Sequence, residues 1–231
     1  AYVIVGGRHQ FFPKRELDTI EYSIEDTYAG LYQQLRGYLG KPRKGRIVEP
    51  GSGELTYARY GLYHYVPAEK QRREPYASLH RAGSLLRGLI RVLLFKRFES
   101  SVFAFKETIR RLLMVHERFL EALSQGFVPA GDDAQAILYE PNLAEEQDLM
   151  DALRQVSGKY STADFDLKRL REHIIHDVDL LKKMLALVEP ITPDQDAKLQ
   201  TLKKRLSQKP LKDGKRLIFT QYADTARYLF D

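Results

Sequence analysis

The chain has 231 residues, with 37 Lys and Arg against 31 Asp and Glu, and it contains neither Cys nor Trp. A hydrophobic fraction of 43% is enough for a buried core and excludes wholesale disorder. Without Cys there is no disulfide, thiol nucleophile or Cys-ligated metal site. No apolar run reaches the roughly 18 residues of a membrane span. The chain begins with neither Met nor a basic leader, so we expect a fragment of a longer protein. The absence of Cys indicates a cytoplasmic location.

Charge is distributed unevenly along the chain. Residues 67–118 carry 12 Lys and Arg against five Glu, whereas residues 127–189 carry 13 acids against seven bases. A basic block beside an acidic one indicates an anionic partner for the basic block. The alternative is that both blocks are solvated helix faces within one bundle.

The first third of the chain alternates between extended and helical patterns. Loose alternation over residues 15–22 predicts a strand. Ser23 is a typical N-cap, and apolar residues at helical spacing predict a helix that ends at Gly40. Residues 41–53 are rich in Gly and Pro and indicate a loop, and the aromatic stretch 54–66 is predicted to be helical.

Long helices dominate the centre. Residues 76–98 are apolar almost all round, which predicts a buried helix whose only polar stripe is Arg87 and Arg91. The Leu and Ile seam of residues 163–188 predicts antiparallel packing on a helix at residues 101–125. A further helix is expected near residues 142–157, after a loop at 127–141 with a short strand at 137–139.

The pattern of the last forty residues predicts a short basic helix at Asp194–Leu206, a strand at Arg216–Thr220 and a helix from Ala223 to Phe230. A lone strand cannot satisfy its backbone groups, so we expect residues 15–22 and 216–220 to pair in one small sheet. The predicted fold class is therefore mainly α, a helical bundle with a small β element.

Two groups of residues are candidates for chemistry. His173, His176 and Asp177 lie within one helical turn and are metal-binding residue types, so a metal-dependent phosphohydrolase is one alternative function. However, helical geometry directs His176 into solvent, and no fourth ligand is identifiable, so no metal site is predicted. His116 lies on an apolar stripe, and we interpret it as a core histidine and not as a catalytic base. Gly6-Gly7 lacks the rest of a phosphate-binding loop, and no catalytic residue is predicted.

Three segments of the chain carry recognisable motifs. They are residues 12–22 with Leu31-Tyr-Gln-Gln-Leu35, residues 94–105, and Asp196-Ala-Lys-Leu199 with residues 215–222 and Thr225. Together they resemble the Swi/Snf-like group of superfamily 2 DNA helicases and translocases. The first resembles the segment that leaves the first ATPase lobe, and the second resembles an L-x-K-R-x-E-S-S-x-x-A-F stretch of bacterial relatives. The third resembles a D-x-K-L helix followed by motif IV of the second lobe.

The resemblance implies a division into an exit from lobe one (1–23), a helical insertion (24–190) and the truncated start of a RecA-like second lobe (191–231). It also implies that the Walker A Lys and the Mg²⁺-binding acidic box precede Ala1 and that the arginine finger follows Asp231. The fragment is then non-catalytic, with ATP and Mg²⁺ bound only by the parent, and it contributes DNA gripping and lobe coupling. The alternative is a free-standing helical module that binds nucleic acid or protein.

DNA is the expected partner, and the basic block supplies the expected contacts. Four of these residues form two pairs spaced four apart, which would converge if their helices form an antiparallel hairpin. Alternatively, Lys96, Arg97 and Glu99 pair internally at the turn. The resemblance to motif IV adds two residues of the last strand. The complete set of candidate nucleic-acid-binding residues is Arg87, Arg91, Lys96, Arg97, Lys106, Arg110, Thr220 and Gln221.

Overall fold

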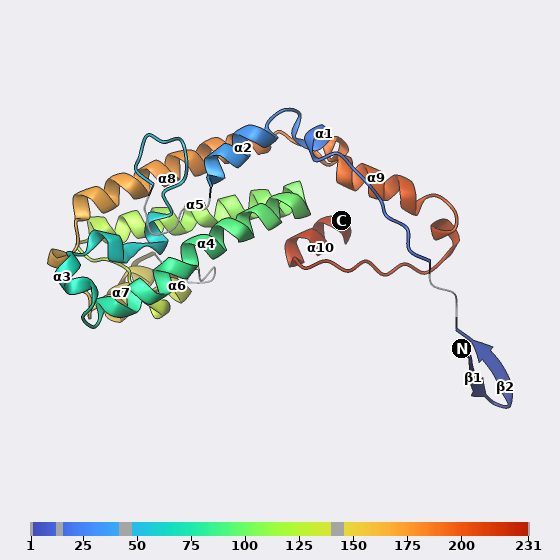
Figure 1. Ribbon diagram of the computed structural model, residues 1–231, viewed down its shortest axis with the longest axis horizontal. Helices are drawn as coiled ribbons and strands as arrows, with labels where there is room; N and C mark the ends of the chain where they lie inside the picture. Colours follow the sequence, from blue (N-terminus) through green and yellow to red (C-terminus); the bar gives the residue numbers. More distant parts are fainter. Residues whose placement is uncertain (1, 13–15, 42–47, 140–145, 231) are drawn as a thin grey trace.

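Two long helices joined by a single residue run through the centre of the molecule (Figure 1). They are α4 (Tyr76–Ser100) and α5 (Val102–Ser124), seen in a computed structural model that describes residues 2–12, 16–41, 48–139 and 146–230. Ser101 has an extended backbone that ends α4, and its hydroxyl accepts a hydrogen bond from the Ala104 N–H at 3.0 Å. A serine cap therefore separates what would otherwise be one continuous helix.

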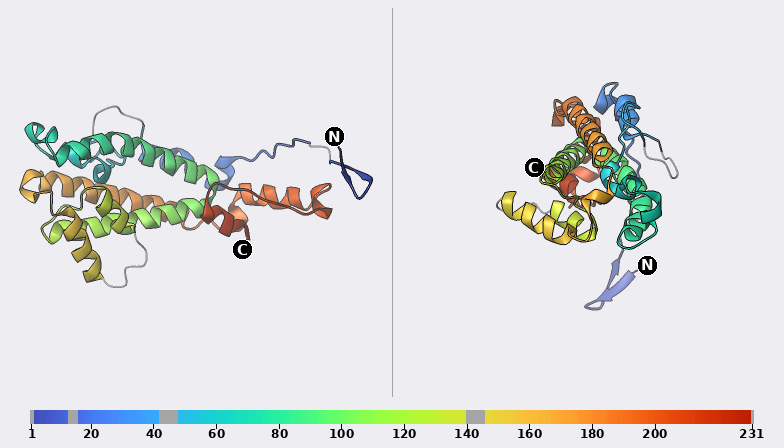
Figure 2. Two further views of the ribbon diagram at one scale, coloured as in Figure 1. Left: turned by 90° about the horizontal axis from the view of Figure 1, so that it is seen from below. Right: turned by 90° about the vertical axis from the view of Figure 1, so that its left-hand side faces the viewer.

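A third long helix, α8 (Leu167–Val188), lies along α5 as predicted (Figures 1 and 2). Contacts of Lys106 with the residue after α8, and of Glu117 with Lys182 inside it, show that the two helices are antiparallel. Side chains spaced three or four apart on α8 form the buried seam. They are Leu170, Ile174, Val178, Leu181, Met184 and Val188.

The core consists of two apolar clusters along this three-helix body. One surrounds Phe119 and Ile174, and the other surrounds Phe105 and Leu181, all fully or almost fully buried. Burial of such side chains is worth roughly 1.5–3 kcal/mol each. The clusters hold the long helices together and leave the α4–α5 connection at one end of the body.

Two shorter helices, α6 (Asp132–Leu138) and α7 (Glu146–Ser157), pack beside the end of α5. The prediction of a strand at residues 137–139 is wrong, because Ile137 and Leu138 belong to α6. Ala134 and Leu138 are four apart and both fully buried, so the apolar period is helical. The first residues of the helix expected at 142–157 lie outside the described residues.

The helix expected from residue 24 onward is broken into α1 (Ile24–Tyr28) and α2 (Tyr32–Leu39). Ser23 is the N-cap as predicted, since its hydroxyl accepts from the Asp26 N–H at 3.2 Å. The break follows from two consecutive residues with left-handed backbones, Ala29 (φ 48°) and Gly30 (φ 87°).

Residues 54–66 contain two 3₁₀ turns where a single α-helix was expected. The turns are Ala58–Tyr60 and Leu62–Tyr65, followed by the one-turn helix α3 (Ala68–Gln71). Tyr57 has a φ of 55°, which is incompatible with a continuous helix. The segment instead inserts its tyrosines between the longer helices, where four of them are buried.

The only sheet in the described part of the chain is a hairpin of β1 (Tyr2–Val5) and β2 (Arg8–Phe11), whose residues are all exposed. Gly6 (φ 57°) and Gly7 (φ 76°) both adopt left-handed backbones, as a tight two-residue hairpin turn requires. The predicted pairing of residues 15–22 with 216–220 is wrong. Neither segment forms a strand wherever it is described, so both predicted strands are wrong as well. A local hairpin closes at a lower entropy cost than a pairing across nearly the whole chain.

The chain ends in α9 (Ala197–Leu206) and α10 (Ala223–Phe230), with short 3₁₀ turns at Pro193–Gln195 and Leu211–Asp213. α10 packs on α5, whereas α9 projects away from the three-helix body (Figures 1 and 2). The mainly α class is thus confirmed. None of the helices in the described part of the chain combines the length and hydrophobicity that a bilayer crossing requires.

Candidate nucleic-acid interface

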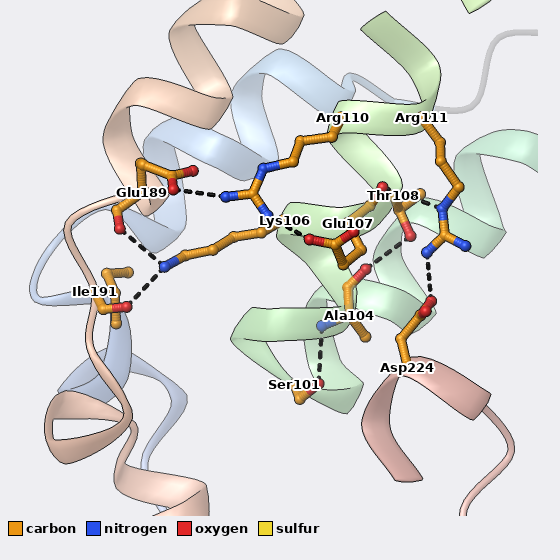
Figure 3. Close-up of polar contacts among 10 residues, drawn as sticks. All are labelled: Ser101, Ala104, Lys106, Glu107, Thr108, Arg110, Arg111, Glu189, Ile191 and Asp224. Atoms are coloured by element: carbon orange, nitrogen blue, oxygen red, sulfur yellow. Dashed lines mark hydrogen bonds and ion pairs between the residues drawn. The ribbon is translucent and has the colours of Figure 1, made fainter. Parts of the chain in front are cut away.

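The connection between α4 and α5, residues 97–101, is the point where the last helix docks; we call it the α4–α5 corner. Arg97, near the end of α4, and Arg111, in α5, each donate to the same Asp224 carboxylate oxygen, both at 2.5 Å. Asp224 is in the first turn of α10 and only 8% exposed. Figure 3 shows Arg111 directed at this carboxylate. Burial raises the pKa of Asp224, but the two arginines outweigh that effect and hold the pKa below its usual value.

Hydroxyl groups complete this contact between α10 and the corner. The Thr225 hydroxyl forms hydrogen bonds with those of Ser100 at 2.8 Å and Ser101 at 3.0 Å. Ser101 and Thr225 are both buried. The same serine therefore caps α5 and binds α10, which joins the two helix N-termini through one side chain.

α9 also attaches to the corner. The Lys198 ammonium donates to the backbone carbonyls of Glu99 at 3.0 Å and Ser100 at 2.9 Å, where a cation offsets the negative end of α4. Burial lowers the pKa of Lys198. Asp196 caps α9 by accepting from the Leu199 N–H at 3.1 Å and also accepts from the Tyr228 hydroxyl at 3.1 Å. This carboxylate therefore links α9 to α10.

The N-terminal segment reaches the same point. The Tyr28 hydroxyl donates to the Phe98 carbonyl at 2.9 Å, and the Tyr22 hydroxyl donates to that of Glu99 at 3.3 Å. Thr27 accepts from the Ala197 N–H at 3.1 Å. Parts of the chain that are 70 to 170 residues apart thus meet at one helix–helix turn.

A cavity of about 200 Å³ lies between the corner, α9, α10 and the extended residues before α10. Its polar lining includes Asp196, Lys198 and Thr225, which already have protein partners. Thr220, one of the predicted nucleic-acid-binding residues, also lines it.

Lys106 and Arg110 bind the end of α8 and do not extend freely into solvent. Lys106 donates to the carbonyls of Glu189 at 2.9 Å and Ile191 at 2.8 Å, and burial lowers its pKa. Arg110 forms ion pairs with Glu107 and, at 2.6 Å, with Glu189. Figure 3 shows both side chains converging on this one end of α8.

The side chains of Arg87 and Arg91 are only partly exposed. Arg91 donates to the Gly40 carbonyl at 2.7 Å and lies over the Phe95 ring, and Arg87 packs so closely on Gly61 that a Cβ there would meet it at 3.2 Å. The predicted convergence with Lys106 and Arg110 is not observed, since the two pairs bind different elements.

The expectation that α4 is buried all round is wrong for the part whose side chains are described. Leu89 is 53% exposed, Val92 46% and Leu93 37%. α4 packs through one side on α5 and the 3₁₀ turns, so the opposite side stays open. The arginines lie at the edge of the packed side because a guanidinium can hydrogen-bond carbonyls there.

The remaining candidates are Lys96, Thr220 and Gln221, which are exposed. Arg97 does not pair with Glu99 in the described contacts, because Asp224 occupies its guanidinium and Tyr222 lies under it at 4.2 Å. Sequence analysis did not find Asp224 or Arg111. No local signal marks them, since Arg97 and Asp224 are 127 residues apart.

The histidines of α8 face protein and not solvent. His173 contacts the Tyr65 hydroxyl at 2.8 Å and Glu49 at 3.1 Å, and His176 contacts the Glu54 carbonyl at 3.0 Å. The predicted exposure of His176 is therefore wrong, because the loop before the 3₁₀ turns covers this face of α8. Among the described residues, no group of three or more His, Asp or Glu is arranged to hold a metal.

Asp177 holds the same loop from the next position of α8. Its fully buried carboxylate accepts from the Thr56 N–H at 2.6 Å, the Thr56 hydroxyl at 2.9 Å and the Ala58 N–H at 3.3 Å. Burial nevertheless raises the pKa of Asp177 to about 6. The His173, His176 and Asp177 cluster therefore serves to attach a loop.

His116 is a core histidine, as predicted. It is 3% exposed, and its Nδ1 lies 2.7 Å from the Leu112 carbonyl. Burial, with a smaller contribution from the charge of Arg59, lowers its pKa to about 3. Arg59 is itself buried, donating to Gln135 and, at 2.8 Å, to the Tyr139 hydroxyl. Sequence analysis did not identify this arginine.

No protein-family model, curated protein or solved structure matches this chain.

Removal of the Asp224 charge is expected to loosen α10 without unfolding the protein. Charge-assisted hydrogen bonds are worth roughly 1.5–3 kcal/mol, so Asp224→Asn should accelerate amide hydrogen exchange in α10 by about ten- to a hundredfold. The exposed Asp194, for which the described contacts show no ion pair, supplies the matched control Asp194→Asn. Unchanged exchange in the Asp224 variant would contradict the assigned role.

Proposed function

We propose that this chain is the central, non-catalytic part of an ATP-dependent DNA helicase or translocase of the Swi/Snf-like type, in which a helical insertion is coupled to the start of the second ATPase lobe. The cofactors of the parent protein are ATP and Mg²⁺, and its location is the cytoplasm. The chain itself grips DNA and transmits movement between lobes.

One observation carries this proposal. The three segments that resemble the helicase family, although far apart in sequence, contact one another at the α4–α5 corner. Arg97 and Ser100 of the K-R-x-E-S-S stretch bind α10, Lys198 of the D-x-K-L helix binds the last carbonyls of α4, and Tyr22 of the first segment binds the Glu99 carbonyl. Chance resemblances would have no reason to meet at one point.

The chemistry of the corner suits a coupling element. Its contacts to α10 include two ion pairs and two hydroxyl hydrogen bonds, beside the stacked rings of Phe103 and Tyr228. Polar contacts of this kind have defined geometry and exchange partners at modest cost, whereas apolar packing resists rearrangement. A helix held in this way can dock and undock as a unit.

The decisive experiment uses the whole reading frame that contains this chain. We expect it to hydrolyse ATP with stimulation by DNA, whereas the isolated 231-residue chain does not hydrolyse ATP because it contains no phosphate-binding loop. In the whole protein, Asp224→Asn should lower the DNA-stimulated rate by at least about fivefold, the size of a typical coupling energy. Asp194→Asn should leave it unchanged.

Two results would contradict the proposal. A whole protein without DNA-dependent ATP hydrolysis would instead indicate the free-standing helical binding module. A DNA-dependent ATPase whose stimulation is identical in the Asp224 and Asp194 variants would show that the corner does not couple the lobes.

A further inference from the structure

The densest concentration of charge in the molecule lies outside the predicted basic block. Residues 203–216, which we call the basic tip, contain seven Lys and Arg against one Asp. They comprise the last turn of α9, the 3₁₀ turn at Leu211–Asp213 and the start of the extended segment. Figures 1 and 2 show this part of the chain at the far end of α9, away from the three-helix body.

Most cations of the basic tip are exposed and available. Arg205 is paired with Asp18, and Arg216 folds back to donate to the carbonyls of Leu211 at 3.0 Å and Lys212 at 2.9 Å. The lysine side chains have no acidic partner among the described residues. These exposed lysines are Lys203, Lys204, Lys209, Lys212 and Lys215.

The predicted basic block of residues 67–118 differs in part: Arg72, Arg73 and Lys96 are exposed, but other cations of the block are bound to protein groups. Arg97 and Arg111 are bound to Asp224, Arg110 to two glutamates, and Lys106 to backbone carbonyls. A cation with such a partner must lose it before it can bind a phosphate. An exposed lysine gives up no protein partner, and the counterions condensed on the DNA phosphates that it neutralises are released, which favours binding.

We propose that the basic tip is the principal surface by which this chain binds the phosphate backbone of duplex DNA. The choice of DNA among polyanions rests on the proposed function, whereas the position of the surface rests on the exposure and pairing of these lysines. Lysine ammonium groups are point charges that contact phosphates without reading bases, so binding is independent of sequence.

The test is a salt titration with a short labelled duplex, measured by fluorescence anisotropy. The variant Lys203→Gln, Lys204→Gln, Lys212→Gln, Lys215→Gln removes four exposed charges and no described contact of these side chains. Each phosphate contact contributes about 0.9 to the slope of log K against log salt. If all four lysines contact phosphates, the slope therefore becomes shallower by about 3.6 in the variant. The affinity near 0.1 M salt is then expected to fall by at least about a hundredfold.

A matched control removes the same charge from the exposed side of α8, as Lys168→Gln, Arg171→Gln, Lys182→Gln, Lys183→Gln. This control should retain the wild-type slope to within about one phosphate contact. Circular dichroism on both variants establishes that the helices are intact. Equal losses in the two variants would overturn the proposal, because binding would then depend only on net charge.

A third variant locates the surface. Arg87→Gln, Arg91→Gln, Lys106→Gln, Arg110→Gln should reduce DNA affinity less than the basic-tip variant, and a larger reduction would overturn the proposal. The whole protein separates the two proposals. If it shows DNA-dependent ATP hydrolysis but its basic-tip variant binds DNA with unchanged affinity, the role of the basic tip is contradicted and the proposed function is not. If the unmodified whole protein shows no DNA-dependent ATP hydrolysis, the proposed function is contradicted instead.

Discussion

Replacement of Phe98 by Ala is expected to lower the free energy of unfolding by about 3–5 kcal/mol. Phe98 is the last large apolar side chain of α4, lies within the α4–α5 corner and is only 1% exposed. Its ring lies 4.2 Å from that of Tyr28, 5.0 Å from that of Phe105 and 5.3 Å from that of Tyr32. Truncation therefore leaves a cavity and also removes aromatic contacts worth roughly 0.5–1.5 kcal/mol each.

The measurement is urea-induced unfolding followed by circular dichroism. Phe98→Leu preserves most of the volume and should cost less than half as much as the alanine variant. Phe219 is 89% exposed, and Phe219→Ala is the matched control, with an expected change within about 0.5 kcal/mol. A Phe98→Ala protein within 1 kcal/mol of the wild type, on the scale of surface substitutions, would show that the corner is not part of the core.

Acidification is expected to destabilise the protein through His116. Burial, and then the charge of Arg59, lowers the pKa of His116 to about 3 in the folded protein, against an ordinary value of 6.5. The unfolded chain therefore binds the proton more readily than the folded protein. The contribution of neutral His116 to the free energy of unfolding is fully present above pH 6.5 and decreases as the pH falls toward 3. At 1.36 kcal/mol per pH unit, the loss at pH 5 is about 2 kcal/mol.

The variant His116→Phe should lack this part of the pH dependence. We expect the difference in unfolding free energy between pH 7 and pH 5 to change by about 2 kcal/mol relative to the wild type. Burial raises the pKa of Asp177 and lowers that of His173, which gives them opposite effects on stability in this range, but both are common to the two proteins. His9, in the exposed hairpin, supplies the control His9→Gln. Equal pH dependence in His116→Phe and the wild type would contradict the assignment.

The apolar face of α4 is open in the isolated chain. Leu89 and Leu93 were expected in the core because the sequence pattern surrounds the helix, yet they are exposed, as is Val92. Hydrophobicity on every side of a helix shows that several surfaces prefer burial, but it does not determine which of them is covered. The direction of packing was decided by α5 and α8, whose single apolar seams have only one way to meet.

Elements with a strong local signal could be predicted from the sequence. The apolar periods of α5 and α8, the cap at Ser23 and the buried position of His116 all depend on neighbours within one or two helical turns. Such interactions are the same in any fold that contains the helix. For this reason the mainly α class and the antiparallel packing of α5 on α8 were predicted correctly.

Only the tertiary structure decided which polar groups pair. Three examples are the ion pairs of Asp224 with the arginines, the hydrogen bonds of Asp177 to the loop and that of Arg91 to the Gly40 carbonyl. They join residues that are 51 to 127 positions apart in the sequence. A charged side chain has many possible partners of opposite sign, and the sequence contains no periodicity that selects among them. The selection is made by the backbone path, because burial excludes water only from the groups that the packed helices bring together.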